Sequence, residues 1–291
     1  MSEFLSPPKN IDRWLGIGLS MLMGLVALLL ILIVAFLASE AWPVIQGDSW
    51  ARFFNSDGWY PLENKFGLLP MLWATLAVSV GAVVLAFPLG LGSAIFIEYY
   101  APRVIGKPFS SVVTLLAGVP SVVFGLWGLT ELVPLINNVH PPGASLLTAI
   151  LVLTLMILPT ISLTSRSALS SLPAHLLQNS AALALSKKSM IVGVLVPTAS
   201  KGIVGGVLLA LVRALGETMA VLMVAGNVVQ TPSGLFDPVR VLTANIALEM
   251  AYATGEHRAA LFASGLLLMV LVICVVWMTS RLSSGEVNGY D

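Results

Sequence analysis

Six long apolar segments dominate this chain of 291 residues, and each is long enough to cross a membrane as a helix. A bilayer core about 30 Å thick requires about 20 apolar residues in a helix. Only 10% of the residues are charged, whereas soluble domains carry about 25%. The sequence therefore predicts an all-α, polytopic membrane protein with six transmembrane helices, at residues 15–38, 70–97, 109–135, 144–165, 202–226 and 259–280.

The first apolar segment, residues 15–38, is too long to be the core of a cleaved signal peptide. Such cores span about 7–15 residues, whereas this run covers about two dozen and follows Lys9 and Arg13. We expect it to be retained as the first span.

Basic residues are distributed unevenly between the two sets of connecting segments. With a cytoplasmic N-terminus, nine of them fall on the inner side, and four fall on the outer side (Arg52, Lys65, Arg240 and Arg258). The positive-inside rule favours this orientation, which places both termini in the cytoplasm. The predicted parts are an N-terminal segment (1–14), a first transmembrane helix (15–38), an external connection (39–69), a transmembrane domain (70–281) with a cytoplasmic loop (166–201), and a C-terminal tail (282–291).

The chain lacks the residue patterns that most enzymes and cofactor sites require. Its single cysteine, Cys274, excludes an intramolecular disulfide framework and a Cys-based metal cluster. The sequence contains no G-x-S-x-G elbow, no H-E-x-x-H pattern and no G-x-x-x-x-G-K-[ST] phosphate loop. Acidic and basic residues number 14 each, which gives no indication of nucleic acid binding. We expect no metal or cofactor in this chain, and any ATP used must be hydrolysed by another subunit.

The most informative motif is Arg213-Ala214-Leu215-Gly216-Glu217-Thr218-Met219, in the middle of the fifth segment. A charge at the bilayer centre costs roughly 2.5–3.5 kcal/mol, so it normally faces the bundle interior or a cavity. Four residues apart on a helix, Arg213 and Glu217 share one face and can neutralise each other. Either the pair only fixes helix packing, or Arg213 transiently meets an anion in a pathway while Glu217 restrains it. Arginine suits oxyanions because its planar fork donates two parallel hydrogen bonds.

Two spans contain residues that interrupt helices: Pro88 in the second, and Gly118 with Pro120 and Ser121 in the third. Broken helices at membrane depth expose backbone N–H groups that attract anions. A proline kink between packed helices is the simpler alternative. Glycines of the fifth segment are expected to allow close helix approach; they are Gly202, Gly206 and Gly216.

Two long connections lie outside the predicted spans. Residues 39–69 are rich in aromatic side chains and too polar to span, so they form either a cap or a surface for an external partner. Residues 166–201 can form a helix, which Pro173 marks at its start. That helix either lies in the membrane interface or docks a cytoplasmic subunit.

Several motifs together resemble one family. The run Arg213-Ala214-Leu215-Gly216-Glu217-Thr218-Met219-Ala220-Val221, continuing to Gly226-Asn227, resembles the PstC-type permease of the bacterial phosphate ABC transporter. The third-span run Gly118-Val119-Pro120-Ser121-Val122-Val123-Phe124-Gly125-Leu126-Trp127-Gly128 is similar to the same family, as is the start of the second span (Phe66-Gly67, Leu69-Pro70 and Thr75-Leu76). The resemblance covers about residues 42–281.

The resemblance implies a type I, MetI-like importer permease in a bacterial plasma (inner) membrane, with residues 39–69 periplasmic. It implies a PstA-like second permease, a PstB-like ATPase dimer that uses ATP, and a periplasmic phosphate-binding protein, in a complex that works by alternating access. Arg213 and Glu217 match the intramembrane charged pair of the family. The substrate pathway is expected to include Gly118, Pro120 and Ser121 as well.

Within residues 166–201, the resemblance implies a coupling helix that docks the ATPase. The residues implicated are Ser180, Ala181, Ala182, Ser186 and Pro197. Ser180 stands where glutamate is usual and Ser186 where glycine is usual. The first change removes a negative charge, and the second removes a residue that easily adopts φ > 0. Pro197 matches the proline that closes the family motif.

Other functions stay open on the sequence alone. The same architecture serves importers of sulfate, molybdate or phosphonate. An ion-coupled secondary transporter would need coupling-ion ligands and usually an internal repeat, and neither is clear here. A membrane scaffold or sensor would leave Arg213 and Glu217 with a packing role only. An intramembrane hydrolase is disfavoured because the required chemistry is missing.

Overall fold

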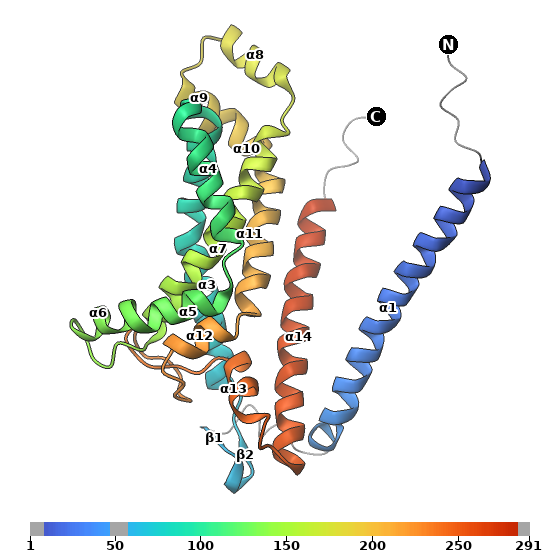
Figure 1. Cartoon of the computed structure of the whole chain (residues 1–291), viewed down its shortest axis with the longest axis vertical. Coiled ribbons are helices and arrows are strands. Elements are labelled where there is room, and N and C mark those ends of the chain that lie inside the picture. Colours follow the sequence, from blue (N-terminus) through green and yellow to red (C-terminus); the bar gives the residue numbers. More distant parts are fainter. Residues whose placement is uncertain (1–8, 47–57, 285–291) are drawn as a thin grey trace.

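The computed structural model describes residues 9–46 and 58–284 and is almost entirely helical (Figure 1). Three five-residue segments, η2, η3 and η4, are π-helical turns, and η1 is a 3-10 turn. In chain order the elements are α1 (Lys9–Ile45), β1 (Trp59–Tyr60), η1 (Pro61–Glu63), β2 (Lys65–Phe66), α3 (Leu69–Ile95), η2 (Phe96–Tyr100), α4 (Arg103–Ala117), α5 (Ser121–Trp127), η3 (Gly128–Leu132), α6 (Val133–Asn137), α7 (Leu146–Ser170), α8 (Ala174–Ala182), α9 (Lys187–Met190), η4 (Ile191–Leu195), α10 (Val196–Thr198), α11 (Ser200–Leu215), α12 (Met219–Val224), α13 (Leu242–Glu249) and α14 (Gly255–Ser284).

Helices α3, α7 and α11 form the centre of the bundle. Their facing side chains are mostly small or branched, and they include the fully buried Ala82, Leu153 and Ala210. Small residues let backbones approach closely. A Cβ added at Gly202 would lie 2.6 Å from Ala168 on α7, and one at Gly206 would collide with Thr164. The predicted close approach of the fifth segment is thus confirmed at these two glycines.

In the part of the chain that the structure describes, four helices are long and apolar enough to cross a membrane, and six spans result if each of two bent helix pairs counts as one. The predicted break at Gly118 and Pro120 is confirmed: α4 and the segment Ser121–Asn137 meet at an angle of 96°. The predicted interruption at Pro88 is wrong, because α3 continues through it from Leu69 to Ile95. Neighbouring helices make a proline tolerable inside a membrane helix, and α3 packs along much of α7.

The fifth span differs from its predicted bounds of 202–226. It consists of Lys187–Thr198 and Ser200–Leu215, which meet at 68°, and the chain leaves helical geometry after Leu215. Arg213 therefore lies in the last turn of α11 and not at mid-helix. Apolar residues continue past the break, so the hydropathy of the sequence does not reveal where the helix ends.

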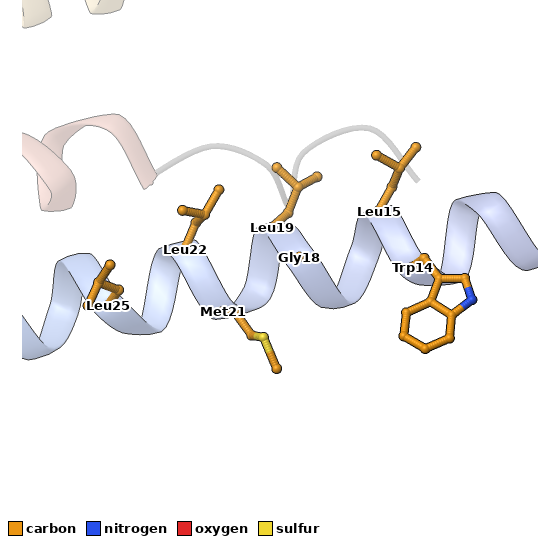
Figure 2. A pocket seen from close by; sticks show the side chains of 7 residues that line it. All are labelled: Trp14, Leu15, Gly18, Leu19, Met21, Leu22 and Leu25. Carbon is orange, nitrogen blue, oxygen red and sulfur yellow. The ribbon is translucent and has the colours of Figure 1, made fainter.

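Helix α1 stands apart from the bundle and is bound to it through α14. Phe36 contacts Phe262 edge to face at 5.7 Å, and Arg258 pairs with Glu40 at 3.6 Å. An open hollow of about 750 Å³ runs along the other half of α1 and is lined only by that helix. Figure 2 shows its lining residues. Its lining is almost wholly apolar and suits lipid chains better than an anion; it consists of Trp14, Leu15, Gly18, Leu19, Met21, Leu22 and Leu25.

The two ends of the bundle are built differently. The first turn of α1, the last turn of α14 and the protruding α8 lie at one end, which we call the α8 end (Figure 1). At the other, the hairpin end, β1 pairs antiparallel with β2 beside α13 and the start of α14. Trp59 and Phe66 anchor this hairpin in an apolar cluster with Met71 and Leu261.

Candidate functional site

The two motifs singled out in the sequence both mark helix breaks, and the helices that follow these breaks pack together. Gly118 ends α4, Pro120 precedes α5, and Ser121 is its first residue. Gly216 ends α11, and α12 begins at Met219. A Cβ added at Gly125 on α5 would lie only 2.9 Å from the Cα of Ala220 on α12. The structure thus joins two segments that are about 100 residues apart in the sequence.

Arg213 presents an exposed guanidinium. It lies in the last turn of α11, where the partial negative charge of the helix end favours a cation. Within the described residues it has neither a hydrogen bond nor an ion pair. A positive charge that is not already neutralised is free to bind an anion.

Glu217 does not neutralise Arg213, and the expected shared helix face is wrong. The helix ends between them, at Leu215. The Glu217 carboxylate instead accepts a hydrogen bond from the backbone N–H of Ala220 at 3.1 Å, which caps α12. The Glu217 carbonyl accepts a bond from the Thr243 hydroxyl at 2.8 Å. Carboxylates are favourable at helix N-termini because they satisfy free N–H groups, so Glu217 fixes the start of α12.

The predicted helix of the 166–201 loop is confirmed as α8, with Pro173 directly before it. Ser180 is its one buried residue, and its hydroxyl bonds back to the Leu176 carbonyl at 2.7 Å. Ala181 and Ala182 are exposed, as is Pro197 in α10. The segment therefore presents an accessible helix connected to the bundle at its two flanks.

The expectation that residue 186 needs a positive φ, which serine adopts less easily than glycine, is wrong. Ser186 has φ −60° and caps α9, where its hydroxyl accepts a hydrogen bond from the Ser189 N–H at 3.2 Å. The left-handed position of this turn is Ala184, with φ +50°. Serine is among the preferred N-cap residues. It therefore suits this position, although glycine is usual there in the family.

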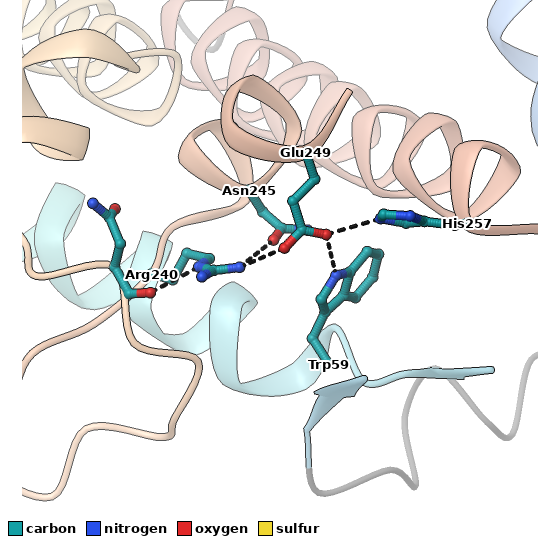
Figure 3. Close-up of polar contacts among 6 residues, drawn as sticks. Trp59, Arg240, Asn245, Glu249 and His257 are labelled. Carbon is teal, nitrogen blue, oxygen red and sulfur yellow. Dashed lines mark hydrogen bonds and ion pairs between the residues drawn. The ribbon is translucent and has the colours of Figure 1, made fainter. Parts of the chain in front are cut away.

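A buried polar cluster at the hairpin end was not found from the sequence. The Glu249 carboxylate pairs with Arg240 at 2.7 Å and contacts the His257 ring nitrogen at 2.8 Å (Figure 3). It also accepts a hydrogen bond from the Trp59 indole N–H at 2.5 Å. Arg240 bonds further to the Asn245 side chain and the Asn227 carbonyl. We call Trp59, Arg240, Glu249 and His257 the Glu249 cluster; it joins four segments of the chain.

The loop before α13 carries a second carboxylate with several donors. Asp237 accepts hydrogen bonds from the Ser233 N–H and hydroxyl and from the Gly234 N–H, at 2.7–2.8 Å. These bonds, chiefly that of the Ser233 hydroxyl, lower the pKa of Asp237 below its ordinary value of 3.8. Unlike Glu249, this carboxylate lies at the surface.

No group of three or more His, Cys, Asp or Glu side chains in the described residues could hold a metal ion. The features that could serve transport are the exposed guanidinium of Arg213, the two helix breaks that pack together and the accessible helix α8.

Comparison with known proteins identifies the architecture. Residues 86–285 match the family described as binding-protein-dependent transport system inner membrane component. The chain is 34% identical to the phosphate transport system permease protein PstC of Xylella fastidiosa strain Temecula1, with 92% of this chain and 91% of that protein covered. It is 38% identical to the probable ABC transporter permease protein YqgH of Bacillus subtilis, with 83% and 80% covered.

Solved structures of ABC transporters share the fold. A chain of the MetNI methionine ABC transporter in an inward-facing conformation aligns with a TM-score of 0.60 and 22% identity, over 75% of this chain and 94% of that one. A chain of a bacterial alginate ABC transporter, solved with a periplasmic protein that binds alginate pentasaccharide, gives a TM-score of 0.64 at 17% identity, over 94% and 96%.

Proposed function

This chain belongs to the binding-protein-dependent inner membrane components, among the phosphate permeases of the PstC type, and from that premise we propose that it forms half of the membrane pathway of an ATP-driven phosphate importer. It is a multi-pass protein of the bacterial plasma membrane. The observation in this chain that supports the proposal is the exposed guanidinium of Arg213, which has no partner among the described residues and lies beside two helix breaks that pack together. An oxyanion in a pathway needs such a donor, and arginine stays charged there.

The partners follow from the two ends of the bundle. Helix α8 is exposed and seats a PstB-like ATPase dimer, which binds and hydrolyses the ATP, since this chain has no phosphate loop of its own. A PstA-like permease completes the pathway on the side that Arg213 faces. A periplasmic phosphate-binding protein delivers its ligand at the hairpin end. Both termini are cytoplasmic, in agreement with the placement of the first turn of α1 and the last turn of α14 beside α8 (Figure 1).

Uptake of radiolabelled phosphate tests the pathway. Vesicles contain the full complex with native Arg213 or with Arg213→Gln, and sulfate and molybdate serve as competitors. We expect ATP-dependent phosphate uptake that resists both competitors and is lost in the variant, while the complex stays assembled. Normal uptake by Arg213→Gln contradicts the role of Arg213. Competition by sulfate or molybdate assigns the complex to another oxyanion.

Docking at α8 has its own test. Ala182→Asp places a charge on the exposed face of α8, and we expect it to abolish co-purification of the ATPase. Gln178→Ala, on the same helix, is the control that adds no charge. Unchanged co-purification of the Ala182→Asp variant with the ATPase argues against docking at this helix.

A further inference from the structure

Helix α8 has few contacts of its own with the bundle. Ser180 is its one buried residue, and Figure 1 shows the helix protruding beyond the ends of its neighbours. Leu176 of α8 packs against an apolar cluster that includes Leu169 and Ile191, so a displacement of α8 reaches the bundle close to the two flanks of the loop. One flank is the end of α7, and the other begins at α9.

Three consecutive residues of the π-helical turn η2 hold these two flanks. Glu98 pairs with Arg166 of α7 at 3.2 Å. The Tyr99 hydroxyl donates to the Leu169 carbonyl of α7 at 3.4 Å. The Tyr100 ring lies 4.7 Å below the ammonium group of Lys187 at the start of α9. A single turn at the end of α3 thus contacts both sides of the α8 loop.

Arg166 extends this connection to a third helix. Its Nε donates to Glu98, and its Nη1 donates to the Ser110 hydroxyl of α4 at 2.7 Å. Helix α4 runs directly to the break at Gly118 and Pro120. Arginine can bridge two helices in this way because its fork carries several donors in fixed directions. The chain of contacts leads from the α8 loop through Arg166 to the helix break beside α12.

We propose that Glu98, Arg166 and Ser110 form the coupling contact that transmits movement of α8 to α3 and α4. Arg166 is a positioning residue, since it acts through these helices and need not touch the substrate. The Arg166 and Glu98 side chains are 37% and 25% exposed, so the pair can break and reform at little cost. The turn η2 is a π-helix, a geometry that often marks functional sites. The inference rests on the proposed docking of an ATPase at α8.

The test uses the complete transporter in vesicles, with Arg166→Gln, Glu98→Gln and the charge-swapped variant that combines Glu98→Arg with Arg166→Glu. The readouts are co-purified ATPase and the number of ATP molecules hydrolysed per phosphate imported. We expect the ATPase to co-purify normally, this ratio to rise by up to about fivefold in both single variants, and the swap to restore part of it. Lys65→Met, which breaks an exposed pair with Glu63 at the hairpin end, is the control and keeps the native ratio.

A second readout does not depend on phosphate as the substrate. Spin labels at Gln178→Cys on α8 and Val104→Cys on α4, with Cys274→Ser, report whether the two helices move together when ATP is added. Native Arg166 is expected to keep their separation constant, and Arg166→Gln to change it. If the native complex imports no phosphate, the proposed function fails, while the label distances still decide the coupling.

Two outcomes overturn the inference. The first is a native ATP-to-phosphate ratio together with native label distances in Arg166→Gln. The second is loss of the assembled complex in both single variants and in the charge swap, which assigns the pair a purely structural role.

Discussion

The two ends of the bundle each carry an arginine–glutamate pair, and the pairs differ in burial and in the number of donors. At the hairpin end the Arg240 and Glu249 side chains are 19% and 9% exposed, and two further donors reach the same carboxylate. At the α8 end the Arg166 and Glu98 side chains are 37% and 25% exposed, and a single residue donates to Glu98 in the described chain. The same residue types thus occur in two different environments.

Burial decides what each pair contributes. A buried charge that loses its partner remains uncompensated in a poor solvent, which costs several kcal/mol. In a partly exposed pair, water can replace the lost partner, at a cost of about 0–1 kcal/mol. The Glu249 cluster therefore holds the hairpin, α13 and α14 in one arrangement, whereas the Glu98–Arg166 pair allows movement. This contrast fits the proposed orientation, in which the substrate arrives at the hairpin end and the ATPase docks at the α8 end.

The largest expected effect follows from Glu249→Ala. The change leaves Arg240 and His257 without their common carboxylate, so we expect the free energy of unfolding to fall by about 3–5 kcal/mol. Chemical denaturation of the purified chain in detergent measures it. Glu63→Ala, at the exposed pair with Lys65, is the matched control. A loss for Glu249→Ala no greater than for Glu63→Ala contradicts the rigid-end interpretation.

Trp59→Phe isolates one donor of the same cluster. A smaller phenyl ring then occupies the apolar site, and the indole N–H that reaches Glu249 is removed. Hydrogen bonds to charged groups contribute about 1.5–3 kcal/mol, and we expect a loss in that range by the same denaturation measurement. Trp42→Phe on the exposed face of α1 should be neutral. Equal effects of the two changes would mean that the hydrogen bond from Trp59 to Glu249 contributes nothing measurable to stability.

Glu98→Ala measures how much the Glu98–Arg166 pair at the α8 end contributes to the free energy of unfolding. Because the pair is partly exposed, we expect the free energy of unfolding to change by at most about 1 kcal/mol. The same denaturation series therefore places this variant near Glu63→Ala and far from Glu249→Ala. A loss of several kcal/mol would remove the difference between the two ends and with it the argument for movement at α8.

The sequence predicted features that depend on local chemistry. Pro173 before α8 and the break at Gly118 and Pro120 were found because proline and glycine restrict the backbone wherever they occur. The family match is likewise carried by short, contiguous motifs. The end of α11 was missed because one of the contacts that follow it is not local: the Thr243 hydroxyl, 26 residues away, donates to the Glu217 carbonyl.

The Glu249 cluster could not be predicted for the same reason. Trp59 and Glu249 are 190 residues apart, and Arg240 was one of four basic residues assigned to external segments by the charge distribution. Nothing in the spacing of these residues indicates that they meet. Trp50, Phe53 and Phe54 of the same aromatic connection lie outside the described residues, so the predicted connection 39–69 is described only at its two ends, residues 39–46 and 58–69.

The smallest expected effect concerns Asp237. Comparing it with Glu249 separates the contribution of hydrogen bonds from that of burial. Like Glu249, its carboxylate accepts three hydrogen bonds, but it lies at the surface. The lowered pKa of Asp237 means that its contribution to folding is present above the ordinary pKa of 3.8 and is lost as the pH falls through the lowered value.

At neutral pH, Asp237→Asn should therefore speed hydrogen exchange at the Ser233 and Gly234 amides while leaving denaturation unchanged. Mass spectrometry of peptides covering residues 231–238 measures this exchange, with Asp237→Glu as the variant that keeps the charge. If Asp237→Asn destabilises the chain as much as Trp59→Phe does, the number of donors, and not burial, distinguishes the two ends of the molecule.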